Sequence, residues 1–208
     1  MAEADPEPVS VGLGELAGRD RYRLLTTLVV PRPIAWASTW SPDGTPNLAP
    51  FSYFAALSST PALIGISIGS RSGSPKDTLE NIRASGAVCV NVVTMHQLDA
   101  MNRTSEEVGP GVNEFLLAGL EWRQSPRVDA PYVVGCPAVL ECELRKEMGL
   151  PGSSNVLVVA EVIGVRLAPN LLPDEGYAVD PERLRPIGRM GGDGYMLPDA
   201  FRWVLRPR

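Results

Sequence analysis

The sequence predicts a mainly β protein with a few short helices, folded as a Greek-key-like antiparallel barrel. At least six segments have the residue pattern of strands, and turn signals rather than long helices separate them. Glycine and proline each occur 20 times in 208 residues, which favours a turn-rich β protein over a helical bundle. Because an open sheet of this size would expose two edges, we expect it to close into a barrel or a split barrel.

Composition indicates one globular domain. Hydrophobic residues make up 44% of the chain and charged residues 21%, as in ordinary globular proteins. A domain of this length buries roughly 70% of its unfolded surface, which is enough for a single core. The chain begins acidic and proline-rich, so we expect a flexible arm over residues 1–18 and a single domain over residues 19–208.

Charge and cysteine content narrow the classes of function. A net charge of −5, without a basic cluster among aromatic residues, argues against a nucleic-acid partner. No apolar run reaches membrane-spanning length, so we expect no membrane partner. The 3 cysteines lack the spacing of a metal site, and their odd number favours a reduced, cytoplasmic protein without a metal.

The first half of the chain contains a short helix and four strands. The turn signal Ser41-Pro42-Asp43-Gly44 joins the first two strands into a hairpin. The two later strands are largely apolar, as is typical of buried strands. The expected elements are a helix over residues 20–28 and strands over residues 34–40, 45–51, 62–68 and 87–93.

The second half of the chain contains two more strands and a long tail. Residues 139–146 alternate between apolar and charged side chains, and residues 156–165 form a longer apolar run. Helical segments are expected over residues 96–103 and 113–118. From residue 169 onward the apolar side chains are scattered among glycine, proline and charge, and we expect them to pack on another surface such as a second subunit.

Residues 71–81 (RSGSPKDTLEN) combine the start of a helix with basic side chains. Ser74 can cap this helix, Pro75 suits its first position and Asp77 completes a capping-box pattern, which predicts a helix over residues 75–85. Free N–H groups and the helix dipole make such a start attractive to anions.

Arg71 and Lys76 add positive charge to this helix start, and Thr78 adds a hydroxyl donor. A phosphate group therefore fits there. The alternative is an ordinary capped surface helix whose charges are solvated, and the local sequence leaves both interpretations open.

Residues 65–69 (GISIG) match the nucleophile-elbow pattern of serine hydrolases. The order Ser67, Asp77 and His96 also matches a hydrolase triad. An elbow requires a strand, a sharp turn and an immediate helix, whereas Ser67 lies inside an apolar run. A serine hydrolase that uses Ser67 is therefore kept as the less favoured alternative. His96 is the only histidine, and we interpret it as a surface or helix-capping residue.

Residues 47–54 (NLAPFSYF) leave a strand and are expected to break it at Pro50. Main-chain polar groups beside aromatic residues could hydrogen-bond a flat heteroaromatic ring there, with a Phe or Trp covering its surface. Trp36 and Trp40 lie on the neighbouring strand. The alternative is simple core packing at the end of a hairpin.

Six segments occur in an order that identifies a family. They are residues 31–39 (PRPIAWAST), 47–54 (NLAPFSYF), 75–78 (PKDT), 113–115 (NEF), 138–142 (AVLEC) and 161–165 (EVIGV). Together they cover the chain from about Tyr22 to Tyr195, and they resemble the flavin reductase-like family. The resemblance implies an FMN-binding split β-barrel and a homodimer with flavin near the subunit interface.

The resemblance also implies which residues surround the cofactor. By resemblance, the residues near the flavin are Arg32, Ser38 and Thr39. The residues that border its ring, largely through main-chain groups, are Asn47, Ala49, Pro50, Phe51, Ser52 and Tyr53. The residues that hold the FMN phosphate are Arg71, Lys76, Asp77 and Thr78.

The implied function is an FMN-binding oxidoreductase that transfers hydride or electrons, with NAD(P)H as the expected source and a partner oxygenase as a candidate acceptor. No catalytic acid or base is assigned, because the cofactor carries the chemistry. Many members of the family carry a late histidine, whereas this chain has Arg189 and Tyr195 in that region. A non-catalytic FMN-binding protein is therefore the main alternative.

Overall fold

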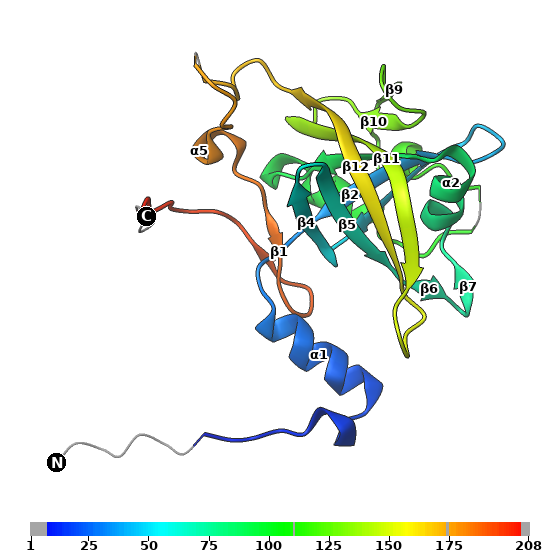
Figure 1. Ribbon diagram of the computed structural model, residues 1–208, viewed down its shortest axis with the longest axis vertical. Helices are drawn as coiled ribbons and strands as arrows, with labels where there is room; N and C mark the ends of the chain where they lie inside the picture. Colours follow the sequence, from blue (N-terminus) through cyan, green and yellow to red (C-terminus); the bar gives the residue numbers. More distant parts are fainter. Residues whose placement is uncertain (1–7, 110, 174, 205–208) are drawn as a thin grey trace.

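The structure, a computed structural model, describes residues 8–109, 111–173 and 175–204. Its centre is a seven-stranded sheet in which neighbouring strands pair antiparallel (Figure 1). The mainly β prediction is confirmed. Across the sheet the strands are β3 (Pro46–Phe51), β2 (Ala35–Trp40), β8 (Ala87–Val92), β11 (Ala138–Gly149), β12 (Val156–Leu167), β5 (Ala62–Ile68) and β4 (Phe54–Ser59).

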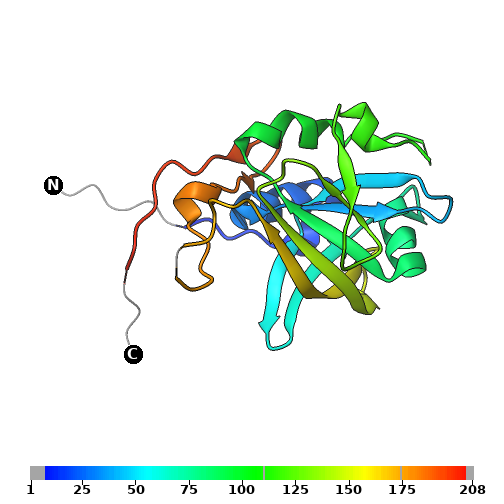
Figure 2. The same ribbon diagram turned by 90° about the horizontal axis from the view of Figure 1, so that it is seen from above.

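The two outer strands of this sheet are neighbours in the chain. β3 and β4 lie at opposite ends of the strand order, yet only Ser52 and Tyr53 separate them. The sheet must therefore curl until its two edges approach each other at this turn, although β3 and β4 do not pair. Figure 2 shows the strands from above, wrapped around the core. The result is a split barrel, one of the two arrangements expected from the sequence.

The interior of the barrel is apolar and includes one face of helix α2 (Asp77–Ser85). Leu79 and Ile82 of this helix are buried, as their helical spacing predicts. The helix ends at Gly86, whose positive φ of 69° lets its N–H reach the carbonyl of Ile82 at 2.8 Å. Other members of this cluster are Ala35, Ala37, Ile64, Ile66, Ile68, Val88, Val90 and Val158.

A second apolar cluster covers the opposite face of β2. Trp36 is fully buried there, and its indole N–H donates to Thr104 Oγ1 at 2.9 Å. The cluster contains Phe115 of α4 (Glu114–Leu117), Met101 of α3 (Leu98–Arg103) and Ile187 from residues 175–204, which we call the late segment. β2 is therefore buried on both faces, and the helices that follow β8 pack against it.

Smaller elements complete the described chain. Short strands form the hairpins β6 (Ser70–Arg71) with β7 (Ser74–Pro75) and β9 (Trp122–Gln124) with β10 (Pro131–Val133), and the small sheet of β1 (Arg32–Pro33), β13 (Gly188–Arg189) and β14 (Tyr195–Met196). The remaining helices are η1 (Leu13–Glu15), α1 (Gly18–Leu28), η2 (Met95–Gln97) and α5 (Pro181–Leu184).

Proline 50 does not end its strand, in contrast to the prediction. β3 continues through Pro50 to Phe51. Because β3 lies at the end of the strand order, the missing N–H of Pro50 faces the open side without removing a ladder hydrogen bond. β4, which follows the turn at Ser52 and Tyr53, is a strand that the sequence pattern did not indicate.

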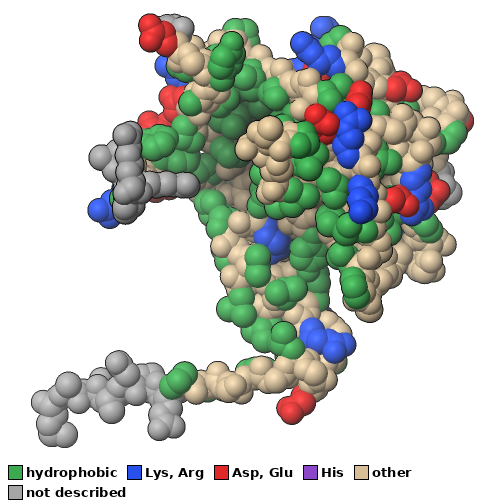
Figure 3. All heavy atoms as spheres, in the orientation of Figure 1, with side chains coloured by type: hydrophobic (Ala, Val, Ile, Leu, Met, Phe, Trp, Pro, Cys, Tyr) green, Lys and Arg blue, Asp and Glu red, His purple; other side chains and the backbone are tan. Residues whose placement is uncertain are grey.

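Helix α1 projects from the barrel (Figure 1). Thr26 is its one buried residue, whereas Tyr22, Leu25 and Leu28 are 57%, 47% and 72% exposed. Figure 3 shows hydrophobic side chains along this helix and on the adjoining surface. The helix thus has an apolar side that no other part of the described chain covers.

The N-terminal residues are exposed, whereas part of the late segment packs against the barrel. Residues 1–7 of the expected N-terminal arm lie outside the described residues, and residues 8–15 are exposed, so the arm remains a prediction. In the late segment, Ile187 is buried and Tyr195 packs against the second cluster, while Trp203 is 76% exposed. None of the described helices is long and apolar enough to cross a membrane.

Candidate functional site

Two adjoining grooves gather most of the predicted site residues. The first, which we call the anion groove, has a volume of about 120 Å³ and is lined by seven of them: Asn47, Ala49, Pro50, Arg71, Lys76, Asp77 and Thr78. The second, the distal groove, has a volume of about 170 Å³ and includes Ser52, Arg189 and Tyr195. Pro50 and Ser105 line both, so the two grooves are neighbours.

The start of α2 differs from the prediction by two residues. Ser74 and Pro75 do not open the helix, because they pair with Ser70 and Arg71 as the hairpin β6–β7. The turn of this hairpin has positive φ at Ser72 and Gly73. Lys76 is instead the N-cap, without a side-chain cap. The hairpin brings Arg71 back beside the helix start, where Lys76 also lies.

Arg71 and Lys76 form a cationic pair at one end of the anion groove. Arg71 Nη1 donates to the carbonyl of Val108 at 2.8 Å, but the buried Nε has no hydrogen-bond partner. Desolvation lowers the pKa of Lys76 below its usual range, the charge of Arg71 lowers it further, and Glu107 opposes the shift. Among the described residues, neither cation forms an ion pair.

This end of the groove therefore fits an anionic ligand, because no carboxylate among the described residues pairs with either cation. A buried donor without a partner costs free energy, and an incoming phosphate oxygen would satisfy it. The first turn of α2, which begins at Asp77, adds main-chain N–H groups that have no intrahelical acceptor. Lys76 also lies 5.5 Å from the centre of the Phe51 ring, which holds its ammonium group near the groove.

A buried hydrogen-bond network supports the floor of the anion groove. Asn47 Oδ1 accepts from Thr78 Oγ1 at 2.9 Å and from Thr39 Oγ1 at 3.3 Å. Asn47 Nδ2 donates to Glu114 Oε1 at 2.9 Å. The other carboxylate oxygen of Glu114 accepts from the main-chain N–H of Leu48 at 3.0 Å. These bonds connect β2, β3, α2 and α4 directly beneath the helix start.

Glu114 is buried, with only 6% of the residue exposed. Desolvation raises its pKa above the ordinary value of 4.5, and the charge of Asp77 raises it further, while the hydrogen bonds from Leu48 and Asn47 oppose the shift. Glu114 therefore acts mainly as an acceptor that orients Asn47 and β3.

Three predicted residues stabilise the walls and do not line either groove. Arg32 donates to the carbonyls of Thr26 at 2.6 Å, Val29 at 3.0 Å and Met190 at 3.0 Å, so it joins α1 to the late segment. Ser38 and Thr39 are both fully buried. Ser38 donates to the carbonyl of Pro131 at 2.6 Å, on the side of β2 opposite to Thr39.

Of the predicted residues around the turn between β3 and β4, one lines a groove and two do not. Ser52 lines the distal groove and accepts from Arg32 Nε at 3.4 Å. Phe51 is buried in the barrel, and Tyr53 lines neither groove. Neither tryptophan of β2 lines these grooves, since Trp36 is fully buried and the indole N–H of Trp40 donates to Gln124 Oε1.

The aromatic side chain of the distal groove comes from the late segment. Tyr195 donates its hydroxyl to Asn102 Oδ1 at 3.0 Å. The guanidinium carbon of Arg189 lies 4.6 Å from the centre of the Tyr195 ring. Pairing of β13 with β14 and with β1 places both side chains beside Pro50.

Several groove residues were not predicted from the sequence. Glu114 lies in the segment 113–115 that contributes to the family resemblance, and it follows the N-cap Asn113, so these two features were the available signals. Thr104, Ser105 and Glu106 belong to a polar run after α3, and that run was the available signal. In the part of the chain that the structure describes, no group of His, Cys, Asp or Glu side chains could hold a metal ion.

Comparison with known proteins identifies relatives across most of the chain. The family model described as flavin reductase like domain matches residues 27–187, more than half of the sequence. An uncharacterized protein of Aquifex aeolicus is 38% identical over 183 residues, which cover 88% of this chain and 92% of that protein.

Two solved structures have the same fold. Nitrilotriacetate monooxygenase component B from Bacillus cereus superposes with a TM-score of 0.90 at 27% identity, over 96% of this chain and 100% of that chain. The 2-nitrobenzoate 2-nitroreductase NbaA of Pseudomonas fluorescens superposes with a TM-score of 0.87 at 26% identity, over 95% and 96%.

The raised pKa of Glu114 predicts how the free energy of unfolding depends on pH. The folded state binds the Glu114 proton more tightly than the unfolded state does, so its contribution to stability is fully present below the ordinary pKa and is lost as pH rises through the folded pKa. The stability of the wild type relative to Glu114→Gln should therefore fall as pH increases above 4.5, measured by urea unfolding.

Glu106→Gln removes an exposed carboxyl group from the same groove and is the matched control. If the stability of the wild type relative to Glu114→Gln increased with pH, the raised pKa of Glu114 would be contradicted. The same would follow if Glu106→Gln and Glu114→Gln changed the pH dependence of stability equally.

Proposed function

The chain belongs to the flavin reductase-like domain family, and from this premise we propose that it is an FMN-binding oxidoreductase. The observation that carries the proposal is the pair of unneutralised cations, Arg71 and Lys76, at the start of α2. Their chemistry matches the phosphate of a mononucleotide. When bound, FMN supplies the hydride and electron transfer chemistry.

The residues of the two adjoining grooves divide into roles. Arg71, Lys76 and the first N–H groups of α2 would hold the phosphate. Thr78 lies at the same helix start, but its hydroxyl donates to Asn47, so its main-chain N–H is the group that remains for the ligand. Asp77 would contribute in the same way.

The ring of the cofactor would lie toward the distal groove. Ala49, Pro50 and Ser52 line this path, and Tyr195 with Arg189 would close its far end. Arg32, Ser38 and Thr39 would act indirectly, because they hold the strands and the late segment that form the walls.

A homodimer is part of this proposal. A volume of about 120 Å³ in the anion groove and about 170 Å³ in the distal groove is small beside the roughly 300–1,000 Å³ of typical ligand pockets. A second copy packed on the apolar side of α1 would deepen the site and cover Leu25 and Leu28. The free state of all 3 cysteines supports the reduced, cytoplasmic setting proposed for it.

The proposed electron donor is NAD(P)H. The names of the two solved relatives describe a monooxygenase component and a nitroreductase. They support two classes of acceptor for this chain, a partner oxygenase and a small nitroaromatic molecule.

A non-catalytic FMN-binding protein is the second candidate. The reason to consider it is that the late segment has Arg189 and Tyr195 where many family members have a histidine. The single histidine of this chain, His96, lines neither groove. The hydrolase alternative loses its structural basis, because Ser67 lies within β5, where it accepts from Asn155 Nδ2 at 3.1 Å, and no helix follows it at once.

Lys76→Ala should weaken FMN binding, because it removes one of two charges that face the phosphate. The expected increase in the FMN dissociation constant is about tenfold or more, measured by fluorescence titration. Riboflavin lacks the phosphate, so its dissociation constant should change by less than about twofold in the same variant.

Lys146→Ala, on the exposed part of β11, is the control and should bind FMN as the wild type does. Equal losses for FMN and riboflavin would show that Lys76 does not contact the phosphate.

Stopped-flow mixing of the FMN-loaded protein with NADH or NADPH separates an enzyme from a binding module. A reductase should bleach the long-wavelength flavin band at a rate that saturates with nicotinamide concentration. Bleaching no faster than that of free FMN under the same conditions would favour the non-catalytic alternative.

Leu28→Asp should shift the protein from dimer to monomer in sedimentation equilibrium, because it places a charge on the apolar side of α1. Leu172→Asp, at an exposed leucine in the loop after β12, is the matched control and should remain dimeric. A dimer that survives Leu28→Asp unchanged would exclude this face of α1 from the interface.

A further inference from the structure

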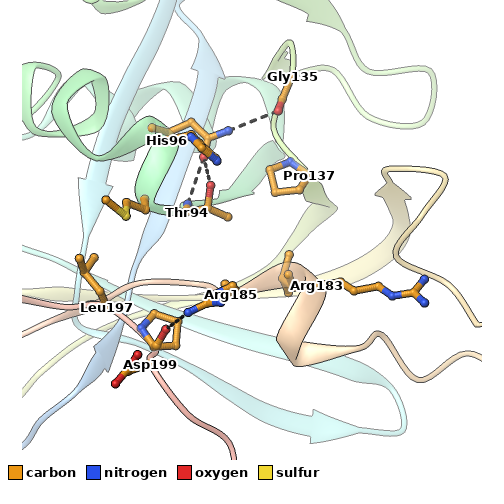
Figure 4. Close-up of a pocket in the computed structure, with 12 residues that line it drawn as sticks. Thr94, His96, Gly135, Pro137, Arg183, Arg185, Leu197 and Asp199 are labelled. Carbon is orange, nitrogen blue, oxygen red and sulfur yellow. Dashed lines mark hydrogen bonds between the residues drawn. The ribbon is translucent and has the colours of Figure 1, made fainter.

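A separate cavity of about 820 Å³ lies beside α5 (Figure 4). We call it the α5 cavity. Its walls are η2, the turn at Gly135, α5 and residues 197–199 of the late segment. Its volume falls in the range of about 300–1,000 Å³ that is typical of small-molecule sites.

The α5 cavity is distinct from the proposed flavin site. It shares no lining residue with the anion groove or the distal groove. The late segment passes between them, since Tyr195 lines the distal groove and Leu197 lines the cavity.

Polar contacts hold the walls of the cavity in place. Gln97 accepts from the main-chain N–H of Thr94 at 3.1 Å and donates to the carbonyl of Gly135 at 3.3 Å. The N–H of Ile187 donates to the carbonyl of Val93 at 3.0 Å, next to a bridge between Thr94 and Pro186. These bonds use the polar atoms of Gln97 for structure and leave His96 and Arg185 as groups available to a ligand.

His96 and Arg185 lie on opposite sides of the cavity (Figure 4). Arg185 Nη2 donates to the carbonyl of Pro198 at 2.7 Å, which anchors the guanidinium group at the wall. Arg183 is different, because its side chain extends away in Figure 4 and bonds Asn170 and Asp180. The apolar parts of the wall are Met95, Pro137, Leu184, Leu197 and Pro198.

The backbone at Arg185 indicates that its side chain has a role. Arg185 follows α5 with a φ of 44° and a ψ of 57°, and its N–H donates to the carbonyl of Pro181 at 2.8 Å. Glycine or asparagine is the usual residue at such a left-handed helix end, because other side chains are strained there. An arginine at this position directs a guanidinium group to the cavity at the expense of that strain.

We propose that the α5 cavity binds a small organic monocarboxylate with an apolar body. The carboxylate would pair with Arg185, and the body would lie along the apolar wall and extend across the cavity toward His96. Asp199 also lines the cavity, and its charge disfavours a free phosphate dianion relative to a singly charged organic acid. The proposal does not depend on flavin binding.

The test uses benzoate as the probe and His96 as the reporter. His96 is the only histidine of the chain, so tag-free protein gives one set of imidazole proton signals. At constant pH, benzoate should shift these signals saturably, both without FMN and with FMN at saturation. Benzamide, which has the same shape without the charge, should not.

Two arginine variants complete the test. Arg185→Asn keeps a residue that tolerates the left-handed backbone, and it should weaken benzoate binding at least about tenfold. Arg183→Asn is the matched control and should bind benzoate as the wild type does. Equal melting temperatures of the two variants would exclude unfolding as the cause.

Three outcomes would overturn the proposal. The first is a His96 signal that benzoate does not shift. The second is a benzoate affinity that Arg185→Asn leaves unchanged, or that FMN abolishes by competition. The third is a His96 signal that changes with protein concentration instead of benzoate, which would mean that a second copy fills the cavity.

Discussion

The hydrogen bonds of one buried asparagine connect the elements that form the candidate site. Asn47 joins Thr78 at the start of α2, Thr39 on β2 and Glu114 on α4, and Glu114 also holds the N–H of Leu48. Because buried polar groups are costly when they lose a partner, this network permits few arrangements of the four elements. The position of the helix start, and with it the position of Lys76, follows from the arrangement that satisfies every member.

The split of the barrel determines where the grooves lie. β3 is an edge strand, so the outer side of Pro50, together with Ser52 in the following turn, remains open to a ligand. The late segment then returns to β1 and places Tyr195 beside Pro50. Continuing past Tyr195, the same segment forms a wall of the α5 cavity. A single stretch of chain thus contributes to both of the sites described above, and it separates them.

Local sequence patterns predicted most strands of the central sheet, and they indicated that Arg71 and Lys76 lie beside a helix start. The hairpin turn at residues 41–44, the apolar strands and the apolar face of α2 depend on neighbours within a few residues. The helix start was misplaced because Ser74 and Pro75 satisfy both a capping pattern and a strand pattern, and pairing with Arg71 decided between them. Arg32 and Ser38 were expected near the flavin, whereas in the structure their side chains donate to main-chain carbonyls of distant segments.

By itself, the sequence determined a turn-rich antiparallel β fold, a helix start with Arg71 and Lys76 beside it, and a resemblance to one family. These features depend on short-range spacing and backbone preferences, which are written along the chain. Only the tertiary structure decided which donors remain unpaired and which carboxylates are buried. Asn47 and Glu114 are 67 positions apart, and Arg32 and Met190 are 158 apart. Contacts at such separations depend on how the whole sheet curls, so no local pattern can specify them.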